Sequence, residues 1–218
     1  MLIPFTKMHG LGNDFVIVDK RYLAKTIDFA LLAQTVLERN TGIGGDQFII
    51  YEQLQNSFSN YEMQIYNPDG SLAKACGNGA RCVAKLIYTN HGSKSIILKI
   101  LDRITKCNID NDHRISINMG RANFDAVWMP TTTQITSIAN NYSLKSGDII
   151  CVDMGNPHLV IFSSLEDERK QILGNELSNS DMFHNDIDNS GKANINFARV
   201  AHGGSKIYLE VFERNTGF

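Results

Sequence analysis

The sequence predicts an α+β protein with two pseudo-equivalent domains, the second of them incomplete. Its 218 residues exceed one average domain and fit two small ones. Runs with the alternation of strands are separated by a few segments with helical periodicity. The halves share a faint repeat: one strand ends at Asn67 and leads to a glycine-rich helix start, and the strand Ile207–Phe212 leads again into a glycine-containing turn. The predicted boundary at 119–120 gives domains 1–118 and 119–218.

The composition limits the kinds of function. The net charge is −2 and charges of both signs are interspersed, so nothing indicates a nucleic-acid partner or a basic membrane-binding patch. The sequence shows no signal peptide and no long apolar run, and we expect no membrane partner. The cysteines are well separated and form no Cys-x-x-Cys pair, which argues against a zinc cluster or disulfide framework and favours a cytoplasmic location. They are Cys76, Cys82, Cys107 and Cys151.

The first half is expected to combine strands with two helices. Residues 5–19 predict a strand, a glycine loop and a buried strand over 15–18. Asp28 is placed to cap an amphipathic helix over 29–39, which ends at a glycine-rich segment. The other predicted strands are 48–51, 61–65, 95–101, 104–109 and 114–119, with a hairpin turn at 111–112.

The second half restarts the same alternation. Residues 126–128 are expected to form a short strand or an entry loop, and residues 131–146 an irregular polar segment. A helix is expected over 165–173, followed by a polar loop over 174–192. The predicted strands are 148–154, 159–162, 194–200 and 206–212, the last two facing each other across a glycine turn.

The stretch 63–88 organises the first half. Its strand ends in a proline–glycine turn at 67–70. A short connector leads to Cys76 and two glycines, and then to an apolar helix over 80–91 that Gly92 closes.

Cys76 is the candidate reactive group. It stands where the N-cap or first-turn residue of this helix would stand, and unpaired backbone N–H groups and the helix dipole favour a thiolate there. Gly77 and Gly79 leave the backbone amides open to a carboxylate. The alternative is that Cys76 is a small buried apolar side chain beside a turn. The strand, turn and glycines in front of the helix favour the reactive role.

Several polar residues stand near the ends of predicted strands. They are Asn13, Gln47, Asn67, Asn156, His158, Asn194, Glu213 and Arg214. Taken singly, each is more often a turn residue or a solvated side chain; a hairpin turn explains Asn13 about as well, and Glu213 with Arg214 could be a surface pair. Together they suit a zwitterion, because amides and arginine bind a carboxylate while carboxylate and amide oxygens bind an ammonium group.

In combination the motifs resemble those of the diaminopimelate epimerases, over the whole chain. The matching segments are 7–15 (Lys-Met-His-Gly-Leu-Gly-Asn-Asp-Phe), 42–47 (Gly-Ile-Gly-Gly-Asp-Gln), 66–70 (Tyr-Asn-Pro-Asp-Gly), 76–82 (Cys-Gly-Asn-Gly-Ala-Arg-Cys), 154–158 (Met-Gly-Asn-Pro-His) and 212–214 (Phe-Glu-Arg). The resemblance implies two domains that face each other across a cleft, each a curved, mostly antiparallel sheet wrapped around a central helix. It also implies the reaction. Two thiols on opposite faces of the α-carbon interconvert LL- and meso-diaminopimelate, for lysine and peptidoglycan precursors, without pyridoxal phosphate, metal or another cofactor.

The resemblance also implies roles for single residues. Cys76 is one of the two acid/base thiols, and the backbone N–H groups of Gly77 and Asn78 bind the reacting carboxylate. His158 and Glu213 adjust the protonation of the thiols. The substrate-binding side chains are Asn13, Gln47 and Asn67 in the first domain and Asn156, Asn194, Glu213 and Arg214, at the distal amino-acid end, in the second. A homodimer is compatible with the resemblance.

The chain departs from the family pattern in its second half. A second Ala-Cys-Gly-x-Gly-Ala motif is missing, and Cys82, Cys107 and Cys151 do not match it, so we expect the second domain to stop before its catalytic helix. Three hypotheses remain open: the epimerase, an inactive remnant that still binds a diamino dicarboxylate, and an isomerase of the same fold with another substrate. The residues assigned to a second amino-acid end argue against the third. A thiol oxidoreductase is disfavoured without a Cys-x-x-Cys pair.

Overall fold

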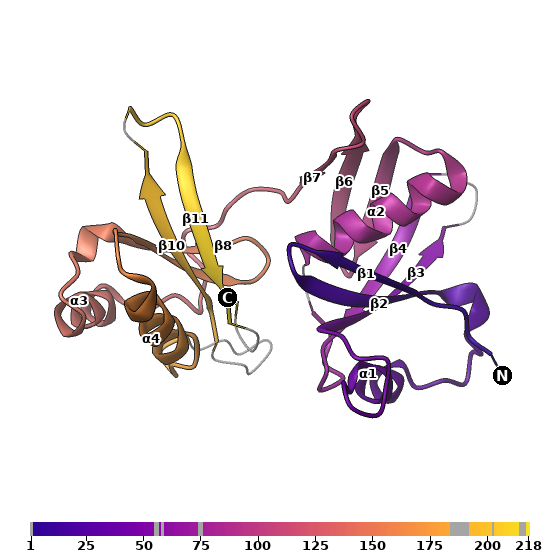
Figure 1. Ribbon diagram of the computed structural model, residues 1–218, viewed down its shortest axis with the longest axis horizontal. Coiled ribbons are helices and arrows are strands. Elements are labelled where there is room, and N and C mark those ends of the chain that lie inside the picture. The colour runs from indigo at the N-terminus through magenta and orange to yellow at the C-terminus, as the bar shows by residue number, and fades with distance from the viewer. Residues whose placement is uncertain are drawn as a thin grey trace. The chain divides into compact units, whose positions relative to one another are not determined.

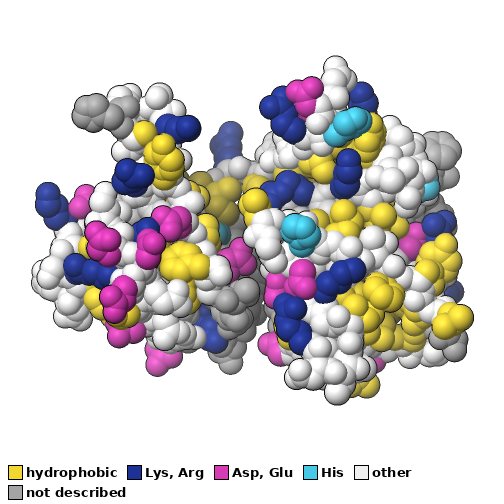
Figure 2. Space-filling view, in the orientation of Figure 1, with side chains coloured by type: hydrophobic (Ala, Val, Ile, Leu, Met, Phe, Trp, Pro, Cys, Tyr) yellow, Lys and Arg dark blue, Asp and Glu magenta, His cyan; other side chains and the backbone are white. Residues whose placement is uncertain are grey.

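The computed structural model describes residues 2–54, 57, 59–73, 76–183, 192–201, 203–213 and 217–218. The chain divides into two compact units, Met1–Gly120 and Arg121–Phe218 (Figure 1). On the face drawn in Figure 2, basic and acidic side chains are interspersed over each unit. Among the described residues, the helices are too short or too polar to cross a membrane.

The first unit is built on a seven-stranded sheet in which the strands follow one another in chain order. The strands are β1 (Thr6–Gly10), β2 (Asn13–Asp19), β3 (Gln47–Gln53), β4 (Asn60–Tyr66), β5 (Ser95–Ile100), β6 (Arg103–Ile109) and β7 (Ile115–Asn118). Neighbours pair antiparallel except β2 with β3 and β4 with β5, which are parallel. This is the mostly antiparallel sheet that the sequence predicted.

Helices cover both faces of this sheet. The helix α2 (Gly77–His91) lies against one face (Figure 1). Side chains from all seven strands pack with it in one core. The helix α1 (Phe29–Leu37) covers the other face, and the short helix η1 (Lys20–Tyr22) follows β2. Along β3, Ile49 faces α2 whereas Phe48 and Ile50 face α1. Since both faces are buried, the strand is apolar at successive positions rather than at alternate ones.

The second unit has a four-stranded sheet in the order β11-β10-β9-β8. Its elements are α3 (Thr132–Asn141), η2 (Ser146–Asp148), β8 (Ile149–Asp153), β9 (Pro157–Phe162), α4 (Asp167–Ser178), β10 (Asn194–Val200) and β11 (Ile207–Phe212). The pair β9–β10 is parallel and the other two pairs are antiparallel. Leu159 and Ile161 of β9 and Ile195 and Phe197 of β10 share one core with α3 and α4. The opposite side of these strands carries the polar residues described below.

The expectation of an irregular segment over 131–146 is wrong, because α3 occupies most of it. Thr131 and Gln134 form a capping box: the Thr131 side chain accepts from the Gln134 N–H, and the Gln134 side chain accepts from the Thr131 N–H. Threonine and asparagine have low helix propensity, so composition alone hid the helix. The cap and the burial of Ile138 and Ala139 compensate for that propensity. Residues 126–128 form no strand. They lie in a loop, and the Trp128 side chain is buried.

The helix α4 also runs further than predicted, to Ser178 rather than to residue 173. Gly174 was expected to begin a loop but lies inside the helix. A Cβ atom there would come within 2.5 Å of the Phe212 ring, so glycine is what allows α4 to pack closely on β11. Residues 184–191 of the predicted loop lie outside the described residues.

Candidate active site

Three amide side chains of the first unit lie at one edge of its sheet because of strand register. Asn13 and Gln47 begin the parallel strands β2 and β3, where Phe15 pairs with Gln47. Asn67 directly follows β4, which runs antiparallel to β3 and pairs Tyr66 with Phe48. Two strand starts and one strand end therefore meet at the same edge.

Cys76 is the N-cap residue of α2, and its thiol lies beside this edge. The helix begins at Gly77, three residues earlier than predicted, because Cys76 itself supplies the cap: its Sγ accepts a hydrogen bond from the Gly79 N–H at 3.2 Å. The Sγ also lies 3.9 Å from Asn13 Oδ1 as a donor. The thiol form thus has an acceptor, and a thiolate has a backbone donor and the positive end of the helix dipole. Such a group can take up and release a proton.

The glycines at the start of α2 have separate roles. A Cβ on Gly79 would stand 2.7 Å from Ile49 Cδ1 and 3.3 Å from Cys76 Sγ, so this glycine lets the helix start approach β3. The first helical bond closes from the Ala80 N–H to the Cys76 carbonyl at 2.9 Å. The N–H groups of Gly77 and Asn78 precede that bond and meet no acceptor in the described part of the chain. They form a cradle for an anion such as a carboxylate.

Gln47 and Asn67 form a chain of amide hydrogen bonds. Gln47 Nε2 donates to Asn67 Oδ1 at 3.0 Å, and Asn67 Nδ2 donates to Ser71 Oγ at 3.0 Å. The remaining oxygen, Gln47 Oε1, is buried and has no hydrogen-bond partner in the structure as described. A buried orphan acceptor costs about 1–3 kcal/mol. A bound ammonium or N–H donor would satisfy it.

An ionic cluster holds the Asn13 side chain through Asp46. Asn13 Nδ2 donates to Asp46 Oδ2 at 3.2 Å, which leaves Oδ1 directed toward Cys76. Arg39 bridges Asp14 and Asp46 at 2.9 and 2.7 Å, and Lys7 pairs with Asp14 at 2.8 Å. Burial acts to raise the pKa of Asp14, but hydrogen bonds from Lys7 and Arg39 outweigh it and hold that pKa well below its usual range. The charged cluster joins β1 and the start of β2 to the loop before β3.

The second unit brings Asn156, His158 and Asn194 together and adds Asn196. His158 on β9 pairs in register with Asn194 on β10. His158 Nε2 lies 3.1 Å from Asn156 Oδ1, and His158 Nδ1 lies 3.1 Å from Asn196 Nδ2. Glu213 follows β11, where its backbone exchanges two hydrogen bonds of 2.8 Å with Gly217. Arg214, also predicted for this group, lies outside the described residues.

Sequence reasoning missed two kinds of residue. Asp46 and Arg39 were not assigned to the site, because the cluster depends on the pairing of two distant loops. Asn196 was missed although a signal exists: the spacing Asn194-x-Asn196 in a strand places both side chains on one face. A polar pair at that spacing in an otherwise apolar strand indicates a buried polar function.

Among the other cysteines, Cys82 and Cys107 are buried and Cys151 is half-buried. Burial raises the pKa of Cys107 and of Cys151 to about 11 in each case, and it also raises the pKa of Cys82. Cys82 belongs to α2, six residues after Cys76, and its side chain lies in the core between the helix and the sheet. All four cysteines lie among the described residues, and Cys76 alone of them caps a helix.

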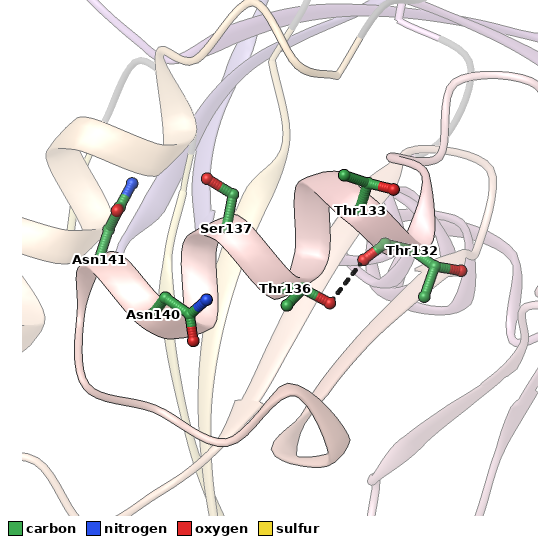
Figure 3. Close-up of a pocket in the computed structure, with 6 residues that line it drawn as sticks. All are labelled: Thr132, Thr133, Thr136, Ser137, Asn140 and Asn141. Carbon is green, nitrogen blue, oxygen red and sulfur yellow. Dashed lines mark hydrogen bonds between the residues drawn. The ribbon is translucent and has the colours of Figure 1, made fainter.

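A hollow along α3 does not compete with this site. Figure 3 shows its lining, six exposed hydroxyl and amide side chains: Thr132, Thr133, Thr136, Ser137, Asn140 and Asn141. Thr136 Oγ1 donates to the Thr132 carbonyl at 2.9 Å, which is ordinary local helix bonding. None of the six can act as an acid or base near neutral pH, and none is a predicted site residue.

Solved structures of epimerases and racemases share this fold. A predicted epimerase from Pseudomonas aeruginosa superposes with a TM-score of 0.58 at 16% identity, covering 90% of this chain and 70% of that one. A hydroxyproline epimerase from Agrobacterium vitis, with bound trans-4-hydroxy-L-proline, has the same TM-score at 10% identity, covering 98% and 70%. At these identities the likeness defines the fold, and the thiol at a helix start adds the chemistry. Together they describe a protein with the fold of these epimerases that carries a thiol at a helix start.

Sequence comparison narrows the class. Residues 5–125 match the family model described as "Diaminopimelate epimerase". The diaminopimelate epimerase of Rickettsia akari is 48% identical over 216 residues, which are 99% of this chain and 76% of that protein. That of Rickettsia felis is 47% identical over 215 residues, with the same coverage. The chain belongs to the diaminopimelate epimerase family.

Proposed function

We propose that the chain supplies the Cys76 side of a cofactor-independent diaminopimelate epimerase, which interconverts the LL and meso forms. The observation that carries the proposal is the position of Cys76: a thiol caps α2 beside two backbone N–H groups that can hold a carboxylate. In the reaction the thiolate takes the proton from the α-carbon and becomes a thiol. The electron pair of the broken C–H bond moves into the carboxylate, where the N–H groups of Gly77 and Asn78 stabilise the developing charge. A second acid on the opposite face returns a proton and inverts the centre.

The other polar residues fit the binding of a diamino dicarboxylate. In the first unit, Gln47 Oε1 is an unused acceptor for the α-ammonium group, and Asn13 and Asn67 hold the site in shape. In the second unit, we assign Asn156 and Asn194 to the distal amino-acid end, together with Glu213 and Arg214. His158 and Glu213 are proposed to adjust thiol protonation.

The residues of the chain favour a second candidate function, binding without epimerisation. Of the three cysteines other than Cys76, Cys82 and Cys107 are buried and Cys151 is half-buried, and none caps a helix, so none is placed to be the second thiol. In that case the isolated chain binds diaminopimelate and supplies only one face of the reaction.

We also propose a cytoplasmic role in lysine biosynthesis and a homodimeric state. The first is supported by family membership and by four cysteines that form no disulfide. The homodimer follows from the family resemblance.

Protection of Cys76 from alkylation tests the proposed function. The native chain is treated with iodoacetamide, with and without diaminopimelate, and each cysteine is quantified by peptide mass spectrometry. Diaminopimelate is expected to slow modification of Cys76 and to leave Cys82 unchanged. Lysine, which lacks the distal carboxylate, is expected to protect less. Equal alkylation of Cys76 in the presence and absence of diaminopimelate would contradict the function.

A further inference from the structure

Asn196 is a buried polar residue on the face of β10 that also carries Asn194. The residue is 4% exposed, and its side chain makes three contacts through one atom, Nδ2. Nδ2 lies 3.1 Å from the Asn194 carbonyl, 3.3 Å from the Leu159 carbonyl and 3.1 Å from His158 Nδ1. The NH₂ group of Asn196 has two hydrogens for these three acceptors, so two of the acceptors share one hydrogen. The contact with the Leu159 carbonyl is the longest of the three.

The neighbours fix the orientation of the Asn196 amide. Main-chain carbonyls can only accept hydrogen bonds, so the NH₂ group and not the oxygen must face Asn194 and Leu159. The same NH₂ group then faces His158 Nδ1, which must accept. An imidazole that accepts at Nδ1 carries its proton on Nε2 when neutral. Two backbone carbonyls thereby determine the tautomer of His158 through Asn196.

The tautomer in turn orients Asn156. His158 Nε2–H donates to Asn156 Oδ1 at 3.1 Å, so the oxygen of that amide is occupied. Its NH₂ group points away from the histidine and meets no acceptor in the described part of the chain. Asn156 is half-buried and follows Gly155, which has a φ of 107° and bonds to Asp153 Oδ1 at 2.6 Å. The loop and the relay together hold the Asn156 oxygen toward His158 and direct its two N–H donors away from the histidine.

We propose that Asn196 is a positioning residue whose amide sets the Nε2–H tautomer of His158, so that Asn156 offers only N–H donors and selects a carboxylate over an ammonium group. The hydrogen-bond relay stands on the geometry alone. The identity of the ligand as the distal carboxylate of diaminopimelate rests on the proposed function. Asn196 itself touches no ligand and acts through its two partners.

The tautomer can be measured without substrate or activity. The full chain is labelled with ¹⁵N-histidine, and long-range ¹H–¹⁵N spectra are recorded at about pH 8.5, where imidazoles are ordinarily neutral. The His158→Gln variant identifies the His158 signals among those of the six histidines. We expect the Nδ1 of His158 to be unprotonated and its Nε2 to be protonated. A proton on Nδ1 in the unmodified chain overturns the proposal, whatever any variant does.

The Asn196→Asp variant replaces the hydrogen-bond donor that faces His158 Nδ1 with an acceptor, in a side chain of almost the same shape. A carboxylate can only accept, so Nδ1 of His158 is expected to become protonated and the relay to lose its direction. Diaminopimelate binding, measured by calorimetry, is expected to weaken on the order of tenfold. Asn140→Asp on exposed α3 makes the same change of charge and is expected to alter neither the spectrum nor the affinity. Unchanged affinity in folded Asn196→Asp overturns the selection of a carboxylate. An Nε2–H tautomer in an unmodified chain that fails to bind diaminopimelate supports the relay and contradicts the proposed function.

Discussion

The two units hold their polar site residues by different means. In the first unit, formal charges on Lys7, Asp14, Arg39 and Asp46 clamp the start of β2, which carries Asn13, and a helix start positions Cys76. In the second unit, the relay through His158 uses neutral groups, with backbone carbonyls as its fixed end. The charged clamp depends on ionisation and resists displacement, whereas the neutral relay depends on hydrogen-bond direction. The first suits a group that must change its protonation, and the second suits the recognition of a fixed charge.

The largest expected effect concerns the single helix-capping thiol. A protein of these 218 residues is expected to show slow or absent α-proton exchange and no detectable interconversion of diaminopimelate epimers. In the proposed function Cys76 serves one face of the α-carbon, and a positioned acid or base is typically worth about 10²–10⁴-fold. NMR of diaminopimelate in D₂O measures both processes, with the Rickettsia akari relative as positive control. Interconversion close to the rate of the control would show that another residue replaces the second thiol.

The next effect compares a glycine in each unit. Gly79→Ala would push a methyl group against buried Ile49, and Gly174→Ala would push one against the Phe212 ring. We expect each to lower the free energy of unfolding by about 1–3 kcal/mol, with the larger loss for Gly174→Ala because a ring cannot move aside as readily as a terminal methyl group. Urea unfolding measures both. Gly147→Ala, which has no heavy atom within 4 Å of its Cβ position, is the control, and a loss there as large as at Gly174 would refute the packing explanation.

A smaller effect separates the thiols. Iodoacetamide is expected to modify Cys76 about tenfold or more faster than Cys82, Cys107 or Cys151 in the native chain. The helix start favours the thiolate at Cys76, whereas burial raises the pKa of Cys107 and Cys151 to about 11. Time-resolved peptide mass spectrometry gives the four rates. Four equal rates in the native protein, rather than only after unfolding, would remove the argument for Cys76.

The smallest effect tests the charged clamp through pH. The pKa of Asp14 is lower in the folded chain than the usual value of about 3.9. A carboxyl with a depressed folded-state pKa stabilises the fold above its unfolded pKa, and the contribution is lost as pH falls through the folded pKa. Asp14→Asn should therefore cost about 1 kcal/mol at pH 7 and less near pH 3, as measured by urea unfolding. The control is Asp112→Asn, which breaks an exposed pair with Arg114, and an equal pH dependence in both variants would argue against a special role for Asp14.

The features predicted correctly from the sequence are those that depend on residues close together in the chain. Cys76 was placed at a helix start by the glycines after it, and β10 and β11 were found from alternation and a glycine turn. The helix α3 was missed because threonine and asparagine have low helix propensity, although Thr131 and Gln134 spell its capping box. The end of α4 was missed because Gly174 looks like a helix breaker until Phe212 is packed against it.

The part of the site that sequence reasoning missed depends on register. Asp14 meets Asp46 and Arg39 because β2 and β3 pair in parallel, and a list of residues does not contain that pairing. Asn196 meets His158 because β9 and β10 pair in parallel. The motifs locate polar side chains near strand ends. The pairing and register of the strands determine which of these side chains are in contact.

The unpartnered oxygen of Gln47 links ligand binding to the stability of the fold. An unpartnered buried acceptor lowers the stability of the empty protein, and an apolar side chain of similar size would remove that penalty. This glutamine, held beside Asn67 by a hydrogen bond, therefore ties the folding stability of the protein to occupancy: a bound N–H donor that reaches Oε1 would raise the free energy of unfolding as well as fill the site.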